Sequence, residues 1–126
     1  ANDAVKAACG YTVRSLRPPK GESNAQVKQL AGSMGLALVF WNHSTHDYRL
    51  DSGQKIASNV QFDTEDKKAL ADGDIILLHD LRKPTAEAAP EIIRALTEAG
   101  YQLVTVQELL NLSADGFMPG KSYKQK

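Results

Sequence analysis

The sequence predicts an α/β fold in which parallel strands alternate with helices. Four short segments are predicted to be strands, of which residues 36–41 and 75–78 have the composition of buried strands, and segments with the apolar spacing of amphipathic helices lie between them. No Asn-Gly or similar hairpin signal joins two of these predicted strands, so consecutive strands are expected to lie parallel through right-handed crossovers. The 126 residues are too few for an eight-unit barrel of about 250 residues, and they suit a small open sheet or half of a barrel.

The N-terminal part of the chain is expected to contain two helices and two strands. Residues 3–9 are Ala-rich and predict a helix, and residues 12–16 predict a strand that ends at two prolines, which cannot donate to a ladder. Asn24 is the expected cap of a helix over residues 25–34, and residues 36–41 predict a second buried strand. The expected inward-facing residues of the second helix are Val27, Leu30, Ala31 and Met34.

The middle of the chain begins with a polar, irregular segment over residues 42–50. Residues 52–62 and 64–71 then predict one broken helix or two short ones, with Thr64 as a cap. Residues 75–78 are consecutive aliphatic side chains, which indicates a strand that is buried on both faces.

The C-terminal part predicts a helix, a strand and a short helix. Residues 85–99 have helical spacing, but Pro90 lies among them, so the main helix could begin at Pro90, where a missing N–H costs little. Residues 102–106 are the last expected strand, and residues 107–112 a short helix. Residues 113–126 are expected to be a polar tail with no evident contribution to the core, so residues 1–112 are assigned to one domain.

Composition and charge exclude several classes of function. Lys+Arg and Asp+Glu are balanced at 15 each, so the sequence indicates no attraction to nucleic acid. No apolar run approaches the roughly 20 residues of a membrane span. The single Cys9 cannot form a disulfide within the chain.

Polar side chains follow the first three expected strands. Arg17 comes after the first strand, Asp47 lies in the segment after the second, and His79 follows the third. Because the carboxyl ends of parallel strands meet at one edge of a sheet, these three side chains are expected to converge. A histidine held by a carboxylate is the usual general acid or base, and an arginine can clamp a second carboxylate or stabilise negative charge. In the alternative interpretation, His79 only hydrogen-bonds a nearby backbone carbonyl.

The usual nucleophiles of hydrolases are not expected at this edge. The sequence has no Gly-x-Ser-x-Gly elbow, and Cys9 lies on an expected helix away from the edge. Metal-activated water would fill this role, but a catalytic metal usually needs about three protein ligands. His43, His46 and Asp47 could be imagined as such a set, and their spacing on an irregular loop supports it only weakly.

Several short motifs, in this order, resemble the third, fourth and fifth motifs of the polysaccharide deacetylases, which form carbohydrate esterase family 4, the NodB-homology group. The motifs are Arg17-Pro18-Pro19-Lys20-Gly21, Trp41 with Asp47-Tyr48, Leu77-Leu78-His79-Asp80, Gly100-Tyr101, and Val104-Thr105-Val106-Gln107-Glu108-Leu109-Leu110. The resemblance implies the C-terminal half of a distorted (β/α) barrel. It also implies metal-dependent hydrolysis of N-acetyl or O-acetyl groups on a polysaccharide such as peptidoglycan or a chitin-like polymer.

The resemblance assigns a role to each matching residue. It implies that His79 is the general acid, that Asp47 orients His79 and raises its basicity, and that Arg17 holds the aspartate that acts as catalytic base. The backbone N–H of Lys20 would stabilise the oxyanion, while Tyr48 and Leu77 would form the pocket for the acetyl methyl group. The family usually has Tyr at the position of Lys20 and Trp at that of Tyr48.

Two motifs of the family do not occur in this sequence. Thr-Phe-Asp-Asp-Gly carries the base and one metal ligand, and His-x-x-x-His carries the other two ligands. The resemblance therefore implies that a divalent metal, expected to be zinc, is bound by residues outside this chain, so this chain alone is expected to be inactive. The expected partners are an acetylated polysaccharide and the N-terminal half of the domain, as a separate chain or a cleaved fragment. A polymeric substrate places the expected enzyme outside the cell or in the cell envelope.

Two other classes of function remain as alternatives. A non-catalytic carbohydrate-binding or scaffold remnant would keep the motifs without the reaction, although it would have no need of the acid and carboxylate pair. A response-regulator-like module that binds Mg²⁺ would need carboxylates at the end of an early strand, where this chain has Arg17 and prolines.

Overall fold

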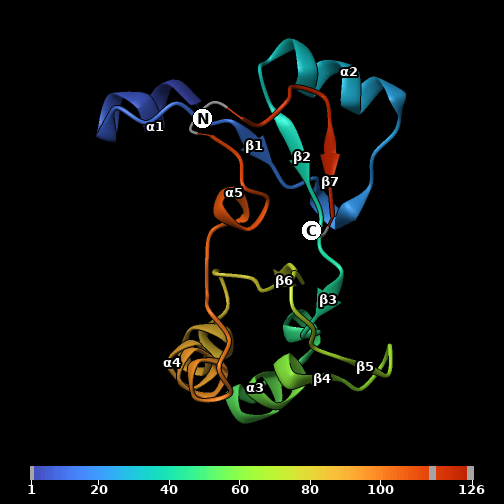
Figure 1. The fold of residues 1–126 in the computed structure, drawn as a ribbon, viewed down its shortest axis with the longest axis vertical. Coiled ribbons are helices and arrows are strands. Elements are labelled where there is room, and N and C mark those ends of the chain that lie inside the picture. The colour runs from blue at the N-terminus through green and yellow to red at the C-terminus, as the bar shows by residue number, and fades with distance from the viewer. Residues whose placement is uncertain (1, 114–115, 125–126) are drawn as a thin grey trace. The chain divides into compact units, whose positions relative to one another are not determined.

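The computed structural model describes residues 2–113 and 116–124, and it shows an α/β fold with parallel sheets (Figure 1). The chain divides into two compact units. Unit 1 comprises residues 2–40, 110–113 and 116–124, and unit 2 comprises residues 41–109. None of the helices in the described residues is long and apolar enough to cross a membrane.

Unit 1 is built around a three-stranded parallel sheet in the order β1-β2-β7. A small core forms where Ala31 packs with Leu36 and Leu38. The side chain of Asn24 accepts a hydrogen bond from the N–H of Val27 at 2.9 Å, which confirms the expected cap. The elements are α1 (Asn2–Cys9), β1 (Ser15–Leu16), η1 (Pro19–Gly21), α2 (Ala25–Ser33), β2 (Ala37–Val39) and β7 (Ser122–Tyr123).

The predicted inward face of α2 is partly wrong. Ala31 is buried, but Leu30 is 62% exposed and Met34 is 56% exposed. The helix packs on a single small sheet through Ala31 and the partly buried Val27, so only a narrow stripe of its surface is covered. Leu30 and Met34 lie outside that stripe.

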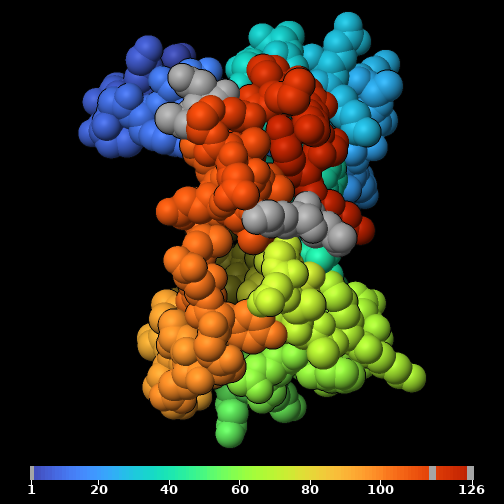
Figure 2. All heavy atoms as spheres, viewed as in Figure 1, coloured from blue at the N-terminus to red at the C-terminus, as the bar shows by residue number. Residues whose placement is uncertain are grey.

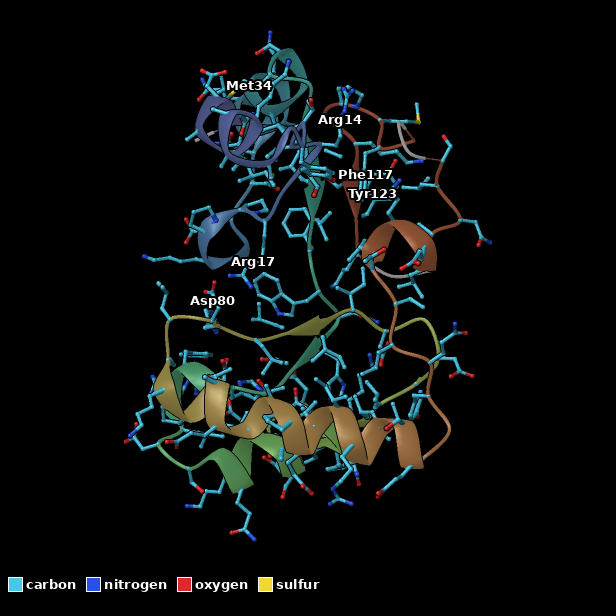
Figure 3. All side chains as sticks on the ribbon, turned by 90° about the vertical axis from the view of Figure 1, so that its left-hand side faces the viewer. Arg14, Arg17, Met34, Asp80, Phe117 and Tyr123 are labelled. Carbon is cyan, nitrogen blue, oxygen red and sulfur yellow. The ribbon has the colours of Figure 1, made fainter. Side chains whose placement is uncertain are left out.

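The segment predicted as a polar tail contributes a strand and two buried aromatic residues. β7 pairs with β2, since the N–H of Leu38 donates to the carbonyl of Lys121 at 2.8 Å. The rings of Phe117 and Tyr123 are both buried and lie edge to face, with centroids 5.6 Å apart. Figure 3 labels the two residues. A parallel pairing between strands this distant in the sequence leaves no local pattern, so the sequence did not indicate it.

Unit 2 combines a two-stranded parallel sheet with a pair of helices. β3 pairs with β6 in parallel, with His43 opposite Ile76 and Ser44 opposite Leu77. The elements are β3 (His43–Ser44), η2 (Asp47–Arg49), α3 (Gly53–Gln61), β4 (Phe62–Asp63), β5 (Lys68–Ala69), β6 (Ile76–Leu77), α4 (Lys83–Glu98) and α5 (Val106–Leu109). The core that joins α3 to α4 consists of Ile56, Val60, Ala88, Ile92 and Leu96.

The helix predicted over residues 64–71 is wrong, because this segment contains a turn and β5, which pairs antiparallel with the preceding β4. The carboxylate of Asp63 accepts hydrogen bonds from the N–H groups of Glu65 and Asp66, both at 3.0 Å. Lys67 has φ 51°, a left-handed conformation that reverses the chain. A side chain that binds the next backbone N–H groups favours a turn over a helix.

The long helix α4 begins at Lys83, and Pro90 lies inside it. Pro84 occupies the first turn, where its missing N–H costs little. An interior proline costs about 3 kcal/mol. Ile92 and Leu96 follow it and are buried, and each contributes about 1.5–3 kcal/mol, which offsets that cost.

The last predicted strand, residues 102–106, does not form among the described residues, although Val106 begins α5. Leu103 is 45% exposed and Val104 is 42% exposed. A strand exists only where it pairs with another, and the described part of unit 2 offers this segment no paired neighbour. The half barrel therefore stays a prediction.

Candidate active site

A buried aspartate and a half-buried histidine lie together at the carboxyl ends of β3 and β6. Nδ1 of His79 is 2.7 Å from Oδ1 of Asp47, and the backbone N–H of His79 donates to Oδ2 at 2.7 Å. His79 follows β6 and Asp47 begins η2, just after β3. The parallel pairing of these strands brings the two residues together. The sequence predicted that Asp47 and His79 meet, but the expectation that residues 42–50 are irregular is wrong, because they contain β3 and η2.

Asp47 is fully buried, and its carboxylate is completely hydrogen-bonded. The hydroxyl of Thr85 donates to Oδ2 at 2.8 Å, beside the backbone N–H of His79. Burial by itself raises the pKa of the Asp47 carboxyl, but the hydrogen bonds from His79 and Thr85 outweigh burial and hold the pKa below its ordinary value. Asp47 is therefore an ionised acceptor near neutral pH.

The backbone around Asp47 is fixed by a left-handed residue and a threonine. His46 has φ 53° and immediately precedes η2, so the chain turns sharply as it leaves β3. The hydroxyl of Thr45 donates to the carbonyl of Leu77 at 3.0 Å and accepts from the N–H of Asp47 at 3.4 Å. This hydroxyl links the end of β3 to β6 and holds Asp47 beside His79.

The bond to Asp47 sets the orientation of the His79 ring. An ionised carboxylate can only accept, so Nδ1 of His79 carries the proton of the bond to Asp47. Nε2 is the ring nitrogen that does not face Asp47, and 34% of the side chain is exposed. The alternative in which the ring bonds a backbone carbonyl does not match this geometry.

Tyr48 and Leu77 lie next to this pair. The ring of Tyr48 meets the ring of His79 edge-on, with centroids 5.9 Å apart. The guanidinium carbon of Arg49 lies over the Tyr48 ring, 4.8 Å from its centroid. Leu77 is a buried residue of β6, two positions before His79. The exposed ring of Tyr48 therefore contacts the histidine, and the buried Leu77 precedes it by two positions.

Arg17 and Lys20 belong to unit 1. Arg17 lies between β1 and η1, and Figure 3 shows it on that loop. Lys20 lies within η1 and has φ 56°. Their convergence with Asp47 and His79 stays a prediction.

His43, His46 and Asp47 do not form a common ligand set. Nε2 of His43 bonds the carbonyl of Asn59 at 3.2 Å, whereas His46 contacts Asp63 and Asp47 contacts His79. Each of the three side chains therefore has a different partner.

His46, Asp63 and Asp66 form a group whose ligand atoms lie within 4.8 Å of one another. Oδ1 of Asp63 accepts from Nε2 of His46 at 3.0 Å and from two backbone N–H groups. Burial raises the pKa of Asp63, but these hydrogen bonds outweigh it and lower the pKa below its ordinary value. Both carboxylate oxygens of Asp63 already accept hydrogen bonds within the chain, so an ion at this group would compete with His46 and the two N–H groups for them. We interpret the group as a capped turn with a His–Asp pair.

Sequence reasoning missed Thr85 and Asp63. Thr85 lay at the start of a predicted helix, where threonine is common, and nothing in its neighbourhood indicated a contact with Asp47. Asp63 lay between two predicted helices, and its position just before Thr64 was the one available signal for a turn.

A cavity of about 560 Å³ lies within unit 2, away from the Asp47–His79 pair. It is lined by residues 70–76 on one side and by residues that include Tyr101, Leu103 and Val104 on the other. Figure 2 shows this hollow between the orange and the yellow-green segments. Leu103 and Val104, which belong to the predicted last strand, line this cavity and are exposed to solvent.

Comparisons with known proteins give several deacetylases as relatives, although no protein-family model matches the chain. The peptidoglycan-N-acetylmuramic acid deacetylase PdaC of Bacillus subtilis is 34% identical over 107 residues, which are 85% of this chain and 21% of the relative. The structure of T48 deacetylase with substrate matches with a TM-score of 0.77 and 33% identity, over 97% of this chain and 56% of that chain.

A third similar structure is that of a pseudoenzyme. The structure of BA3943, a CE4 family pseudoenzyme from Bacillus anthracis, matches with a TM-score of 0.71 and 28% identity, over 86% of this chain and 36% of that chain. This chain spans about a fifth of the first curated relatives and about half of the first solved ones.

Proposed function

Because this chain is homologous over most of its length to the polysaccharide deacetylases of carbohydrate esterase family 4, we propose that it supplies one half of a deacetylase active site. The reaction would be hydrolysis of N-acetyl or O-acetyl groups on a polysaccharide such as peptidoglycan or a chitin-like polymer. Relatives named as peptidoglycan and chitin deacetylases support this substrate class.

The hydrogen-bonded pair of Asp47 and His79 is the observation that carries the proposal. In the reaction, water adds to the acetyl carbonyl, and the carbon–nitrogen or carbon–oxygen bond then breaks. His79 gives the proton on Nε2 to the leaving amine or alcohol, while Asp47 holds Nδ1 and stabilises the charged ring. A divalent metal bound by residues outside this chain, with zinc expected, would activate the water and polarise the carbonyl.

The remaining site residues have supporting roles in the proposal. Arg17 would hold the aspartate that acts as base, and the backbone N–H of Lys20 would donate to the oxyanion. Tyr48 and Leu77 would contact the acetyl methyl group, and their positions beside His79 support this role.

The proposed partner is the N-terminal half of the same catalytic domain, as a separate chain or a cleaved fragment. Two observations support it: the chain matches about half of solved deacetylase structures, and Leu103 and Val104 are exposed where a strand was predicted. Together the two halves would form the distorted (β/α) barrel. A polysaccharide substrate would place the assembled enzyme outside the cell or in its envelope.

A non-catalytic role in carbohydrate binding or as a scaffold is the second candidate. The relative named as a CE4 family pseudoenzyme shows that this fold can lack activity. The intact Asp47–His79 pair favours the catalytic proposal, because a binding protein has no use for a carboxylate-held acid.

Reconstitution would test the proposal. The chain is mixed with a polypeptide that carries Asp-Asp-Gly and His-x-x-x-His, and acetate release from an acetylated oligosaccharide is measured with and without zinc. We expect activity only in the mixture, and a loss of about 10²–10⁴-fold with His79→Ala. Acetate release that is unchanged by His79→Ala would overturn the assigned acid, and a mixture without activity would favour the binding role.

A further inference from the structure

We propose that Thr85 is a positioning residue that fixes the carboxylate of Asp47, so that one oxygen always faces Nδ1 of His79. The role in catalysis rests on the proposed function, but the contact and its effect on Asp47 do not. Thr85 is buried in the first turn of α4, and its hydroxyl lies 2.8 Å from Oδ2 of Asp47.

The two oxygens of Asp47 have different partners. Oδ2 accepts from Thr85 and from the backbone N–H of His79, and Oδ1 accepts from Nδ1 of His79. Rotation of the carboxylate about its Cβ–Cγ bond would break all of these bonds at once. The hydroxyl of Thr85 and the backbone of His79 come from different elements, so together they define the rotation of the carboxylate.

The direction of the Thr85 bond is also fixed. An ionised carboxylate only accepts, so the hydroxyl must donate its single proton to Asp47. This hydroxyl therefore favours the ionised form of Asp47, and it keeps the oxygen opposite Nδ1 available as an acceptor. The ring of His79 is then held in the form with the proton on Nδ1, and Nε2 is left to exchange the substrate proton.

Arg82 anchors the beginning of α4 to the same turn. Its guanidinium donates to the carbonyls of Tyr48 and Leu50, the second at 3.3 Å, and to Asp51 at 2.9 Å. The first turn of α4 therefore contacts η2 at both the backbone and the Asp47 carboxylate. A site residue held from two sides keeps its geometry during a reaction.

The core of unit 2 makes α4 a rigid support for Thr85. Ala88, Ile92 and Leu96 lie further along the helix and pack against α3. The position of Thr85 is set by this packing and by Arg82, independently of His79.

Two substitutions separate the hydroxyl from the shape of the side chain. Thr85→Val removes the donor and keeps the branched shape, and Thr85→Ser keeps the donor. Thr97→Val is the matched control, because the hydroxyl of Thr97 bonds the carbonyls of Ile93 and Arg94 within α4, away from Asp47. Asp47 is followed by the pH dependence of its carboxyl ¹³C shift, and His79 by its ring ¹⁵N shifts at neutral pH.

We expect Thr85→Val to raise the pKa of Asp47 and to replace the Nδ1-protonated ¹⁵N signature of His79 with an average of two forms. Thr85→Ser and Thr97→Val should match the wild type. An Asp47 titration and a His79 signature that are unchanged in Thr85→Val would overturn the proposal. If the valine variant does not fold, the Asp47 titration and the His79 ¹⁵N signature are measured in Thr85→Ala instead. Both should change in the same way, and no change in either would overturn the proposal.

In a reconstituted active assembly, Thr85→Val is expected to lower kcat about 10-fold with KM unchanged, and Thr85→Ser to restore it. A reconstituted assembly with no activity would count against the proposed function and leave the two spectroscopic results standing. Changed spectra with unchanged kcat would show that Thr85 orients Asp47 without serving the reaction, and would overturn its positioning role in catalysis.

Discussion

Nδ1 of His79 lies 2.7 Å from Oδ1 of Asp47, although 32 positions separate the two residues in the sequence. The parallel pairing of β3 with β6 brings them together, and Thr45 and Thr85 hold the aspartate from two sides. The histidine is the only part of this arrangement with a substantially exposed surface. A reactive group on a buried, hydrogen-bonded support is the arrangement that general acid catalysis requires.

The stability of the chain should depend on pH through Asp47. Hydrogen bonds lower the pKa of Asp47 in the folded chain, so its contribution is present above the unfolded pKa of about 3.9 and is lost as the pH falls through the folded pKa. Asp47→Asn should lower the free energy of unfolding by about 1–3 kcal/mol at pH 7. The difference should shrink toward pH 3. Urea unfolding at the two pH values measures it, and a difference that is independent of pH would contradict the role of the charge.

The His46–Asp63 pair and the turn beside it should stabilise the fold without a bound metal. Asp63→Asn should lower the free energy of unfolding by about 1–3 kcal/mol, because two N–H groups and His46 lose a charged acceptor. Zinc should leave the unfolding temperature of the wild-type chain unchanged. A zinc-dependent rise that disappears in Asp63→Asn would show instead that the group binds the metal.

Leu103 should contribute to association with the complementary half of the domain. Leu103→Asp places a charge on an exposed apolar segment, so it should weaken the complex about 10-fold or more, which is about 1.4 kcal/mol, without destabilising the chain alone. Ile93→Asp is the matched control, because Ile93 is similarly exposed but lies on α4. Titration calorimetry measures the affinity of each variant for the complementary half. Equal affinities for the two variants would show that residues 102–106 do not face the partner.

Pro90→Ala should stabilise the chain by up to about 3 kcal/mol, because alanine restores an N–H in the interior of α4. Pro84→Ala should have a much smaller effect, since Pro84 lies in the first turn. Thermal unfolding of the two variants and the wild type measures the two gains in stability. A larger gain at Pro84 than at Pro90 would mean that the helix begins later than Lys83.

The sequence by itself determined the α/β class, the cap at Asn24, and the meeting of Asp47 with His79, since these follow from local patterns and from the rule that parallel strands share an edge. The homology to family 4 deacetylases was also visible in short motifs around these residues. Tertiary structure decided the features that depend on distant partners. β7 exists because β2 offers it an edge, and residues 102–106 form no strand because the described unit offers them none. Thr85 contacts Asp47 because α4 packs on α3 through Ile92 and Leu96, and no spacing along the chain encodes that contact.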